Sequence, residues 1–277
     1  SYPTLALTRA NQADTISAML RVHAVRAFSD NYIWVLADTD THQSVIVDPG
    51  DASPVRAFLD QNAYHATAIL ATHHHPDHVG GIPKLASPEV QVIGPAQEKI
   101  PGKTHSVSDQ ENFVLPGLDL DVHVLEIPGH TLGHVAFYVP QLSALFCGDT
   151  LFGAGCGRLF EGTADQMHRS LQRLAALPGD TLVYCGHEYT LANLKFALAV
   201  EPDNPALASR RDSDQARIHQ GQPTLPSRLA DELQTNPFLR AEVSAVHAAA
   251  ERHAGRPLHD TTAVFAALRH WKDHFNA

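Results

Sequence analysis

The sequence predicts an α+β fold in which a sheet-rich core is covered by helices and followed by an all-helical region. Between Val22 and His187, short apolar runs of strand character alternate with loops and two helical segments. After His187 the strand signal ends, and residues 191–277 are too many for a tail but enough for a small domain. We therefore expect an N-terminal extension over residues 1–20, a strand-rich domain over 21–190 and a helical domain over 191–277.

Each expected strand is a run of apolar and β-branched residues bounded by turn residues. The strands are expected at Val22–Phe28, Tyr32–Ala37, Ser44–Val47, Ala68–Ala71, Val90–Ile93, Leu118–Ile127, Val135–Val139, Ala144–Cys147 and Thr181–Cys185. Helical spacing of apolar residues predicts helices at Pro54–Gln61, Ala164–Leu177, Leu191–Val200, Asn204–Gln220, Leu239–Arg252 and Thr261–His274. Residues 222–227 are expected to be an extended connector, with Ser227 placed to cap a helix.

The most informative stretch is Thr-His-His-His-Pro-Asp-His at 72–78, directly after an expected strand. His73 and His75 are two apart, so an extended loop aims both rings the same way, and Asp77 and His78 follow on the next turn. Burying so many polar groups unpaired is costly, whereas a bound cation satisfies them together. The spacing therefore predicts two neighbouring metal positions. A surface histidine cluster is the alternative, and the flanking strand and glycine pair argue against it.

Two metal positions need more ligands than one loop supplies, and three later segments offer them. His130, Asp149 and His187 each follow an expected strand, and each comes directly after a glycine that allows close backbone approach. Imidazole and carboxylate ligands suit zinc, iron or manganese, with zinc the commonest choice. Asp48 ends another expected strand, where it either orients a ligand histidine or is an ordinary turn residue.

These residues follow the order found in the metallo-β-lactamase superfamily, and that resemblance implies two sheets in an αββα sandwich. It also implies two divalent metal ions with Asp149 and a water or hydroxide between them. The implied ligands are His73, His75 and His130 for the first ion, and Asp77, His78 and His187 for the second.

Three further blocks resemble the hydroxyacylglutathione hydrolase (glyoxalase II) family. They are residues 148–163, the Glu-Tyr-Thr that follows His187, and Asn-Pro-Phe-Leu-Arg at 236–240. The resemblance covers nearly all of the chain after about residue 20, and it implies that residues 191–277 help bind glutathione. By this resemblance the glutathione-binding residues are Arg158, Phe160, Tyr189 and Arg240.

The residue types agree with such a ligand, because guanidinium groups pair bidentately with the carboxylates of a tripeptide. Eukaryotic members carry lysine and tyrosine where this chain has Arg158 and Phe160, so the pattern looks bacterial. Those members also have a further basic residue just after the position matched to Arg240, where this chain has Ala241, Glu242 and Val243.

The implied reaction is hydrolysis of S-D-lactoylglutathione to D-lactate and glutathione, the second step of methylglyoxal detoxification. The metal ions would lower the pKa of a bound water toward 7, and the resulting hydroxide would attack the thioester carbonyl. Asp77 and Asp149 are the catalytic carboxylates of this hypothesis, because Asp77 could accept the proton of the water while Asp149 bridges the ions. The thiolate that leaves has an ordinary pKa near 8.5, so no strong general acid is required.

The competing hypothesis is a glutathione persulfide dioxygenase that uses a single iron on the same fold. The helical C-terminal region and its Asn-Pro-Phe-Leu-Arg block argue against it, because those enzymes lack this region by resemblance. A non-catalytic metal-binding protein is disfavoured because every ligand position is filled.

Composition limits the partners and the setting of the protein. The formal net charge of −10 argues against a nucleic-acid partner. There is no apolar run near the roughly 18 residues of a membrane helix, and no basic-then-apolar start typical of a secretory signal. The odd set of three cysteines, without a C-x-x-C, predicts reduced thiols. We therefore expect a cytoplasmic monomer that acts on a small molecule, with no membrane partner.

Overall fold

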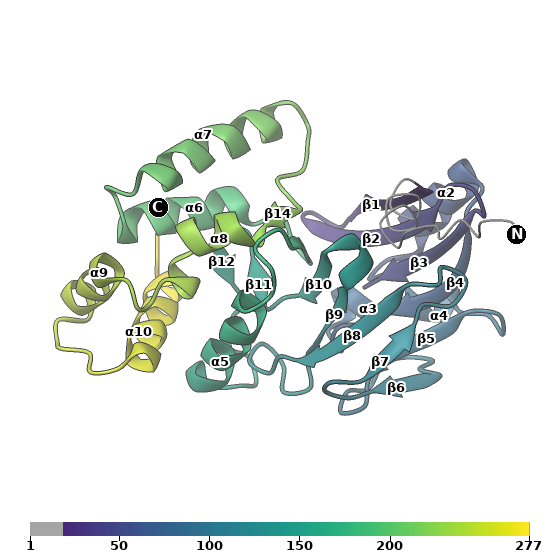
Figure 1. Ribbon diagram of the computed structural model, residues 1–277, viewed down its shortest axis with the longest axis horizontal. Helices are drawn as coiled ribbons and strands as arrows, with labels where there is room; N and C mark the ends of the chain where they lie inside the picture. Colours follow the sequence, from purple (N-terminus) through teal and green to yellow (C-terminus); the bar gives the residue numbers. More distant parts are fainter. Residues whose placement is uncertain (1–18, 277) are drawn as a thin grey trace, which may run out of the picture.

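In the computed structural model, which describes residues 19–276, two six-stranded sheets lie face to face (Figure 1). The first sheet has the order β1-β2-β3-β4-β5-β6, with β1 to β3 antiparallel and β3 to β6 parallel. Its strands are β1 (Leu20–Ala27), β2 (Asn31–Asp38), β3 (Gln43–Val47), β4 (His65–Leu70), β5 (Gln91–Pro95) and β6 (His105–Val107).

The second sheet has the order β14-β13-β10-β9-β8-β7. Its strands are β7 (Asn112–Val114), β8 (Asp121–Glu126), β9 (Val135–Val139), β10 (Ala144–Gly148), β13 (Leu182–Cys185) and β14 (Ser227–Arg228). A small hairpin of β11 (Leu151–Phe152) and β12 (Gly155–Cys156) follows β10.

Strand β2 shows how the layers are held together, because both of its faces are buried. Trp34 packs between the two sheets, where its ring meets the edge of Tyr184 at 4.9 Å. Ile33 and Val35 point the other way, into a second apolar cluster that includes Val55 of helix α2. A strand that is buried on both faces reads as a continuous apolar run, which is why the sequence identifies it clearly.

Helices cover the outer faces of both sheets (Figure 1). Helix α5 lies against the second sheet through Met167, Leu171 and Leu174, and its first turn is closed by a capping box of Thr163 and Gln166. The helices are α2 (Ala52–Asn62), α3 (Pro76–Val79), α4 (Ile82–Leu85), α5 (Ala164–Ala175), α6 (Thr190–Val200), α7 (Pro205–His219), α8 (Leu229–Thr235), α9 (Ser244–Ala254) and α10 (Thr261–Asp273). Short 3₁₀ turns occur at η1 (Pro140–Leu142) and η2 (Pro237–Leu239).

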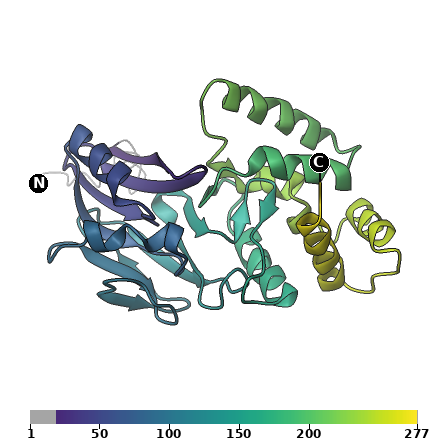
Figure 2. The ribbon, with the colours of Figure 1, turned by 180° about the vertical axis from the view of Figure 1, so that it is seen from behind.

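Helices α6 to α10 gather at one end of the molecule, as the two opposite views show (Figures 1 and 2). They are tied to the sheets next to the β11–β12 hairpin. Arg269 donates to the carbonyl of Cys156 at 2.7 Å, and Asn236 donates to the carbonyl of Gly155 at 3.0 Å. The helical region is therefore joined directly to the segment that follows Asp149.

The predicted α+β class, the two sheets and their helical covering are confirmed, whereas several element bounds are wrong. The strand expected from Leu118 begins at Asp121, because Asp119 has a φ of 52° and Leu118 and Leu120 reach the core from a turn. The helix expected from Leu239 begins at Ser244, after the η2 turn.

The connector at 222–227 also differs from the prediction. Ser227 lies in β14 and pairs with Val183 of β13 rather than capping a helix. Helix α8 follows from Leu229, with Arg228 at its N-cap. Strands β6, β7, β11 and β12 were likewise not expected, because two or three residues carry too little periodicity.

Most of the predicted N-terminal extension, residues 1–18, lies outside the described residues. Within residues 19–276, no helix is both long enough and apolar enough to cross a membrane.

Candidate metal centre

The predicted metal ligands all lie at one edge of the two sheets. His73 and His75 follow β4, while His130, Asp149 and His187 follow β8, β10 and β13. Strand β9 is antiparallel to both β8 and β10, and β10 is parallel to β13. The carboxyl ends of β8, β10 and β13 therefore lie at the same edge of the sheet. The remaining two, Asp77 and His78, lie in the short helix α3, which begins with Pro76.

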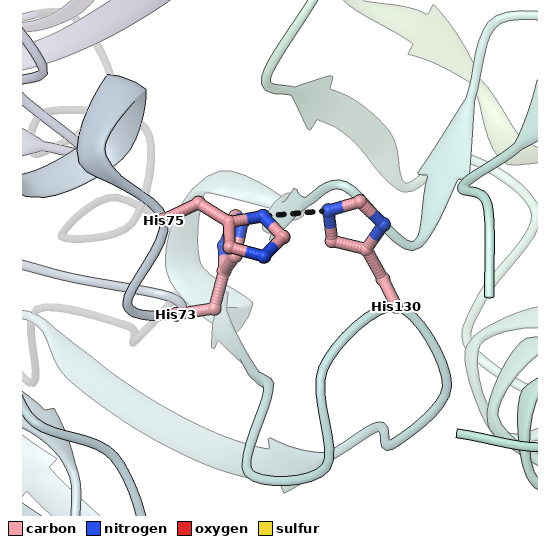
Figure 3. A group of neighbouring side chains, drawn as sticks. All are labelled: His73, His75 and His130. Atoms are coloured by element: carbon pink, nitrogen blue, oxygen red, sulfur yellow. Dashed lines mark hydrogen bonds between the residues drawn. The ribbon is translucent and has the colours of Figure 1, made fainter. Parts of the chain in front are cut away.

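The side chains form two groups of donor atoms. In the first group, His73, His75 and His130 bring one ring nitrogen each to within 4.8 Å of the others. Figure 3 shows His75 and His130 facing each other across the group, with Nδ1 of His75 3.1 Å from Nε2 of His130. The second group brings together Asp77, His78, Asp149 and His187 within the same distance.

Asp149 lies between the two groups. Its Oδ2 is 3.2 Å from Nε2 of both His78 and His187, and 3.4 Å from Nε2 of His130. The same oxygen is 3.9 Å from Nε2 of His73. One carboxylate oxygen therefore faces ligands of both groups, which is the arrangement expected of a bridging residue.

Asp48 orients two of the imidazoles from behind. Its Oδ2 accepts a hydrogen bond from the Thr72 hydroxyl at 2.7 Å and lies 3.1 Å from Nδ1 of His78. The Thr72 oxygen lies 2.9 Å from Nδ1 of His73. Because each Nδ1–H has an acceptor, the Nε2 lone pairs of His73 and His78 point into the centre. From the sequence, Asp48 had two possible roles, either orienting a ligand histidine or acting as an ordinary turn residue, and its contacts favour the first.

His130 and His187 are oriented in the same way by other partners. Nδ1 of His130 lies 2.8 Å from the carbonyl oxygen of Arg158, and Nδ1 of His187 lies 2.8 Å from Oδ1 of Asp30. Asp30 is a contact that the sequence analysis missed, because it lies in the turn between β1 and β2 without any motif.

Three buried atoms of the centre have no hydrogen-bond partner among the described residues. They are Nε2 of His73, Nε2 of His78 and Oδ1 of Asp149. Buried polar atoms are rarely left unpaired, because each costs free energy. Their nitrogen and carboxylate chemistry suits divalent transition metals. The residues therefore fit a divalent metal centre.

The pKa shifts of two of these histidines show that the site favours positive charge. Burial lowers the pKa of His187, but its hydrogen bonds to Asp149 and Asp77 raise that pKa to about 10. Burial also lowers the pKa of His78, and the charge of Asp149 outweighs it and raises that pKa well above the ordinary value. The carboxylates thus create a negative potential where cations would bind.

Two glycines leave room for the centre. A Cβ at Gly186 would collide with Oδ1 of Asp149, and a Cβ at Gly148 would collide with the Thr72 hydroxyl. Gly148 also has a φ of 51°, a conformation that favours glycine. Both positions must remain without a side chain for β10 and β13 to deliver Asp149 and His187.

His134 and two of the cysteines have interior positions. The ring of His134 stacks on His73 with 4.5 Å between centroids, and its Nε2 accepts from the amide of Asp149 at 3.2 Å, as expected for an interior histidine. Cys147 and Cys185 are fully buried, and burial raises the pKa of both thiols. Neither thiol is suited to act as a nucleophile.

A cleft of about 510 Å³ opens from the metal centre toward the helical region. Arg158, Phe160 and Tyr189, which the sequence singled out for ligand binding, all line it. The Tyr189 ring lies parallel to that of His187 at 4.8 Å, and Phe160 meets His130 edge-on at 5.2 Å. Phe160 is 64% exposed, so its apolar face is available to a ligand.

The structure does not bring Arg240 to this cleft. Its Nε and Nη2 donate to the carboxylate of Glu201 at 2.8 and 2.9 Å, and its Nη1 donates to the carbonyl of Leu233. The guanidinium is thus already paired within the helical region. The prediction that Arg240 binds the ligand is therefore not supported by its position.

Two basic residues of α10, Arg269 and Lys272, line the cleft instead, and the sequence analysis missed them. Their spacing of three places both on one face of the helix, which is the signal that could have found them. Asp273 lies 2.7 Å from Arg269 and 3.9 Å from Arg158. One carboxylate thus faces two of the three cationic side chains, and the mouth of the cleft keeps a net positive charge.

Comparison with known proteins agrees with these features. Residues 27–187 match the metallo-beta-lactamase superfamily, and residues 188–275 match the family described as hydroxyacylglutathione hydrolase C-terminus. A hydroxyacylglutathione hydrolase of Alkalilimnicola ehrlichii is 54% identical over 92% of this chain and 99% of its own length. One from Nitrosomonas eutropha is 52% identical over 93% of this chain and all of its own length.

Solved structures share the fold at lower identity. The B3 metallo-beta-lactamase BLEG-1 has a TM-score of 0.60 at 21% identity, covering 80% of this chain and 99% of its own. TTHA1623, solved in a di-iron-bound form, has a TM-score of 0.51 at 28% identity, covering 60% of this chain and 92% of its own. The chain therefore belongs to the hydroxyacylglutathione hydrolase family within the metallo-beta-lactamase superfamily.

Proposed function

We propose that this protein hydrolyses S-(2-hydroxyacyl)glutathione thioesters, with S-D-lactoylglutathione giving D-lactate and glutathione in the second step of methylglyoxal detoxification. The observation that carries the proposal is the cleft itself, which joins the two donor groups at Asp149 to a cationic mouth. Relatives that share about half of their residues over nearly the full chain bear the name of this activity.

The proposal includes two divalent metal ions, zinc first and iron or manganese as alternatives. The two donor groups, with Asp149 facing both, support this number. Bound ions of this kind lower the pKa of a coordinated water and polarise a carbonyl oxygen. His73, His75 and His130 would hold one ion, and Asp77, His78 and His187 the other.

Asp77 is suited to handle the proton of the attacking water. Its side chain is 39% exposed and lines the cleft, while its Oδ2 is held by Asn31 at 3.0 Å and faces His78 and His187 at 3.3 Å. Asp149 is almost fully buried and has the bridging position instead. The two carboxylates are thus suited to different roles because their exposures differ.

The mouth of the cleft provides the contacts for glutathione. Arg158 and Lys272 can pair with the carboxylates of the tripeptide, while Arg269, held by Asp273 and the Cys156 carbonyl, adds positive charge beside them. Burial helps raise the pKa of Tyr189 to about 12, which keeps its hydroxyl a donor. Because all three cysteines are free and buried, we place the reaction in a reducing compartment, the cytoplasm.

Persulfide dioxygenation with one iron is not favoured. The second donor group is complete, with two carboxylates and two imidazoles, and a mononuclear centre has no use for it. The match of residues 188–275 to the hydroxyacylglutathione hydrolase C-terminus points the same way.

The test is thioester loss from S-D-lactoylglutathione by the purified protein, before and after treatment with a chelator. We expect fast hydrolysis that ends on chelation and returns with zinc, iron or manganese. A lactoyl thioester of N-acetylcysteamine, which lacks both carboxylates, is the matched control and should be hydrolysed poorly. Equal turnover of both thioesters would contradict the glutathione assignment, and activity that survives metal removal would contradict the metal centre.

A further inference from the structure

Glu98 is a buried carboxylate that neither the metal centre nor the cleft uses directly. It lies on the turn after β5, where its amide donates to the carbonyl of Pro95 at 3.2 Å. The ammonium of Lys103 donates to the carbonyls of Pro95 and Glu98 at 2.7 and 2.9 Å. The residue is 6% exposed. A carboxylate so deeply buried is costly unless donors surround it, so its partners indicate its role.

The partners come from the two loops that carry the three-histidine group. Oε2 of Glu98 accepts from the amide of His74 at 2.7 Å, between His73 and His75. Oε1 accepts from the Thr131 hydroxyl at 2.5 Å and from the amide of Gly133 at 3.1 Å. One side chain therefore joins the loop after β4 to the loop after β8.

The loop after β8 has the room and the hydrogen-bond donor that the side chain of Glu98 needs. A Cβ at Gly133 would lie 2.6 Å from Cγ of Glu98, so any residue other than glycine would displace the carboxylate. Thr131 is fully buried and directs its hydroxyl to the same oxygen. Both features place the carboxylate beside the residue that follows His130.

We propose that Glu98 is a positioning residue that holds His73 and His75 at ligand distance from His130. The three rings come from two separate loops, and Figure 3 shows that they face each other across the gap between these loops. Within the described structure, the side chain of Glu98 accepts no hydrogen bond from a residue of the second donor group. The inference rests on the proposed metal centre, and it assigns Glu98 to one half of that centre only.

Glutamine is a sharp test of this role, because it is nearly isosteric and carries only one oxygen. The amides of His74 and Gly133 donate to different oxygens of Glu98. Whichever way the glutamine amide turns, its NH₂ faces one of these two N–H groups. Glu98→Gln must therefore break one of the two links between the loops.

The measurement is stepwise binding of Co(II) to the metal-free protein, followed by absorption spectra and chelator competition, with thermal unfolding as a second readout. We expect Glu98→Gln to lower the affinity for the ion at the three-histidine group about tenfold to a hundredfold, as is typical when a hydrogen-bond partner behind the ligands is removed. The other ion should keep its affinity within about twofold. With one Co(II) bound, the absorption spectrum of Glu98→Gln should match that of His130→Ala, which lacks a ligand of the three-histidine group. It should differ from that of His187→Ala, which lacks a ligand of the second group.

Glu161→Gln is the matched control, because Glu161 joins the same loops at the surface. Its Oε1 lies 2.7 Å from Nε2 of His74, and its Oε2 accepts from the amide of Leu132 at 2.9 Å. The side chains of His74 and Glu161 are both more than a third exposed, so water can replace the carboxylate. Its effect should stay within about twofold. If Glu98→Gln does not fold, Thr131→Val removes one link alone and should show the same selective loss, about threefold to tenfold.

Equal weakening of both ions, or unchanged affinity at both with only a lower unfolding temperature, would overturn the positioning role. Wild-type protein that binds fewer than two Co(II) ions would instead count against the metal centre itself. The two failures are therefore distinguishable, and neither depends on thioester turnover.

Discussion

The two ends of the cleft are built in different ways. At the metal end, five of the seven candidate ligands are buried and four imidazoles have an acceptor at the outer nitrogen, so the donor atoms are held in place. At the mouth, Arg158 and Phe160 are about two-thirds exposed. The first end is suited to exact geometry for chemistry, and the second to attraction of a charged, flexible ligand.

The difference implies that mutations at the two ends should affect different kinetic quantities. A residue of the metal end stabilises the reacting atoms and should change kcat. A residue of the mouth contacts bound substrate and transition state alike and should change KM.

The largest effect is expected at Asp149. Asp149→Ala removes the carboxylate oxygen that lies within 3.4 Å of Nε2 atoms from both donor groups, so we expect kcat to fall by at least about a thousandfold. The measurement is steady-state hydrolysis of S-D-lactoylglutathione together with metal content by mass spectrometry. Full activity with two ions per chain would refute the bridging role.

The sequence predicts that the side chains of the metal end lie together, and there is a physical reason why it can do so. His73, His75, Asp77 and His78 lie within one short segment, so their proximity is local. His130, Asp149 and His187 each follow an apolar strand and a glycine, and both signals can be read without knowing the fold.

The residues that support the metal end could not be predicted in this way. Asp30 and Glu98 reach their partners only after the strands have assembled, at separations of 157 and 24 to 35 residues in the chain. No spacing rule connects such positions.

The mouth shows a different limit. The resemblance drew attention to Arg240, yet Arg240 is paired with Glu201, and Arg269 and Lys272 reach the cleft from a helix that looks ordinary in the sequence. Which basic side chains reach the cleft, and which are paired elsewhere, depends on tertiary contacts that sequence patterns do not report.

Arg240→Ala should therefore act on stability rather than on binding. It leaves the carboxylate of Glu201, which is only 6% exposed, without its bidentate partner. We expect a loss of about 2 kcal/mol, or roughly 5 °C in the unfolding midpoint, with KM unchanged within about twofold. Calorimetry and steady-state kinetics on one preparation would decide the matter, and a raised KM with normal stability would return Arg240 to the binding site.

Lys272→Ala should show the opposite pattern. Within the described structure Lys272 makes no salt bridge within 4.0 Å, and it lines the cleft. Loss of one charge-assisted contact should raise KM about tenfold, with kcat and the unfolding midpoint nearly unchanged. Lys99→Ala is a suitable control for the loss of one positive charge, because Lys99 is outside the cleft lining. A tenfold change in kcat would mean that Lys272 acts on the chemistry.

The smallest effect concerns pH. Partial burial and the neighbouring charges of Arg269 and Arg158 lower the pKa of Lys272 from its ordinary value. A lowered pKa means that the ammonium loses its proton, and its attraction for a carboxylate, at a lower pH than an ordinary lysine would. KM of the wild-type protein should therefore begin to rise on the alkaline side at a pH below the usual lysine range.

The variant Lys272→Arg separates this titration from that of the metal end. A guanidinium stays charged throughout the accessible range, so KM of the variant should remain flat where KM of the wild type rises about threefold or more. Both proteins keep the same metal ligands, so any pH dependence of kcat should be shared. If the alkaline rise in KM persists in the arginine variant, the group that titrates is not Lys272, and the charge at the mouth is then set by residues other than the lysine of α10.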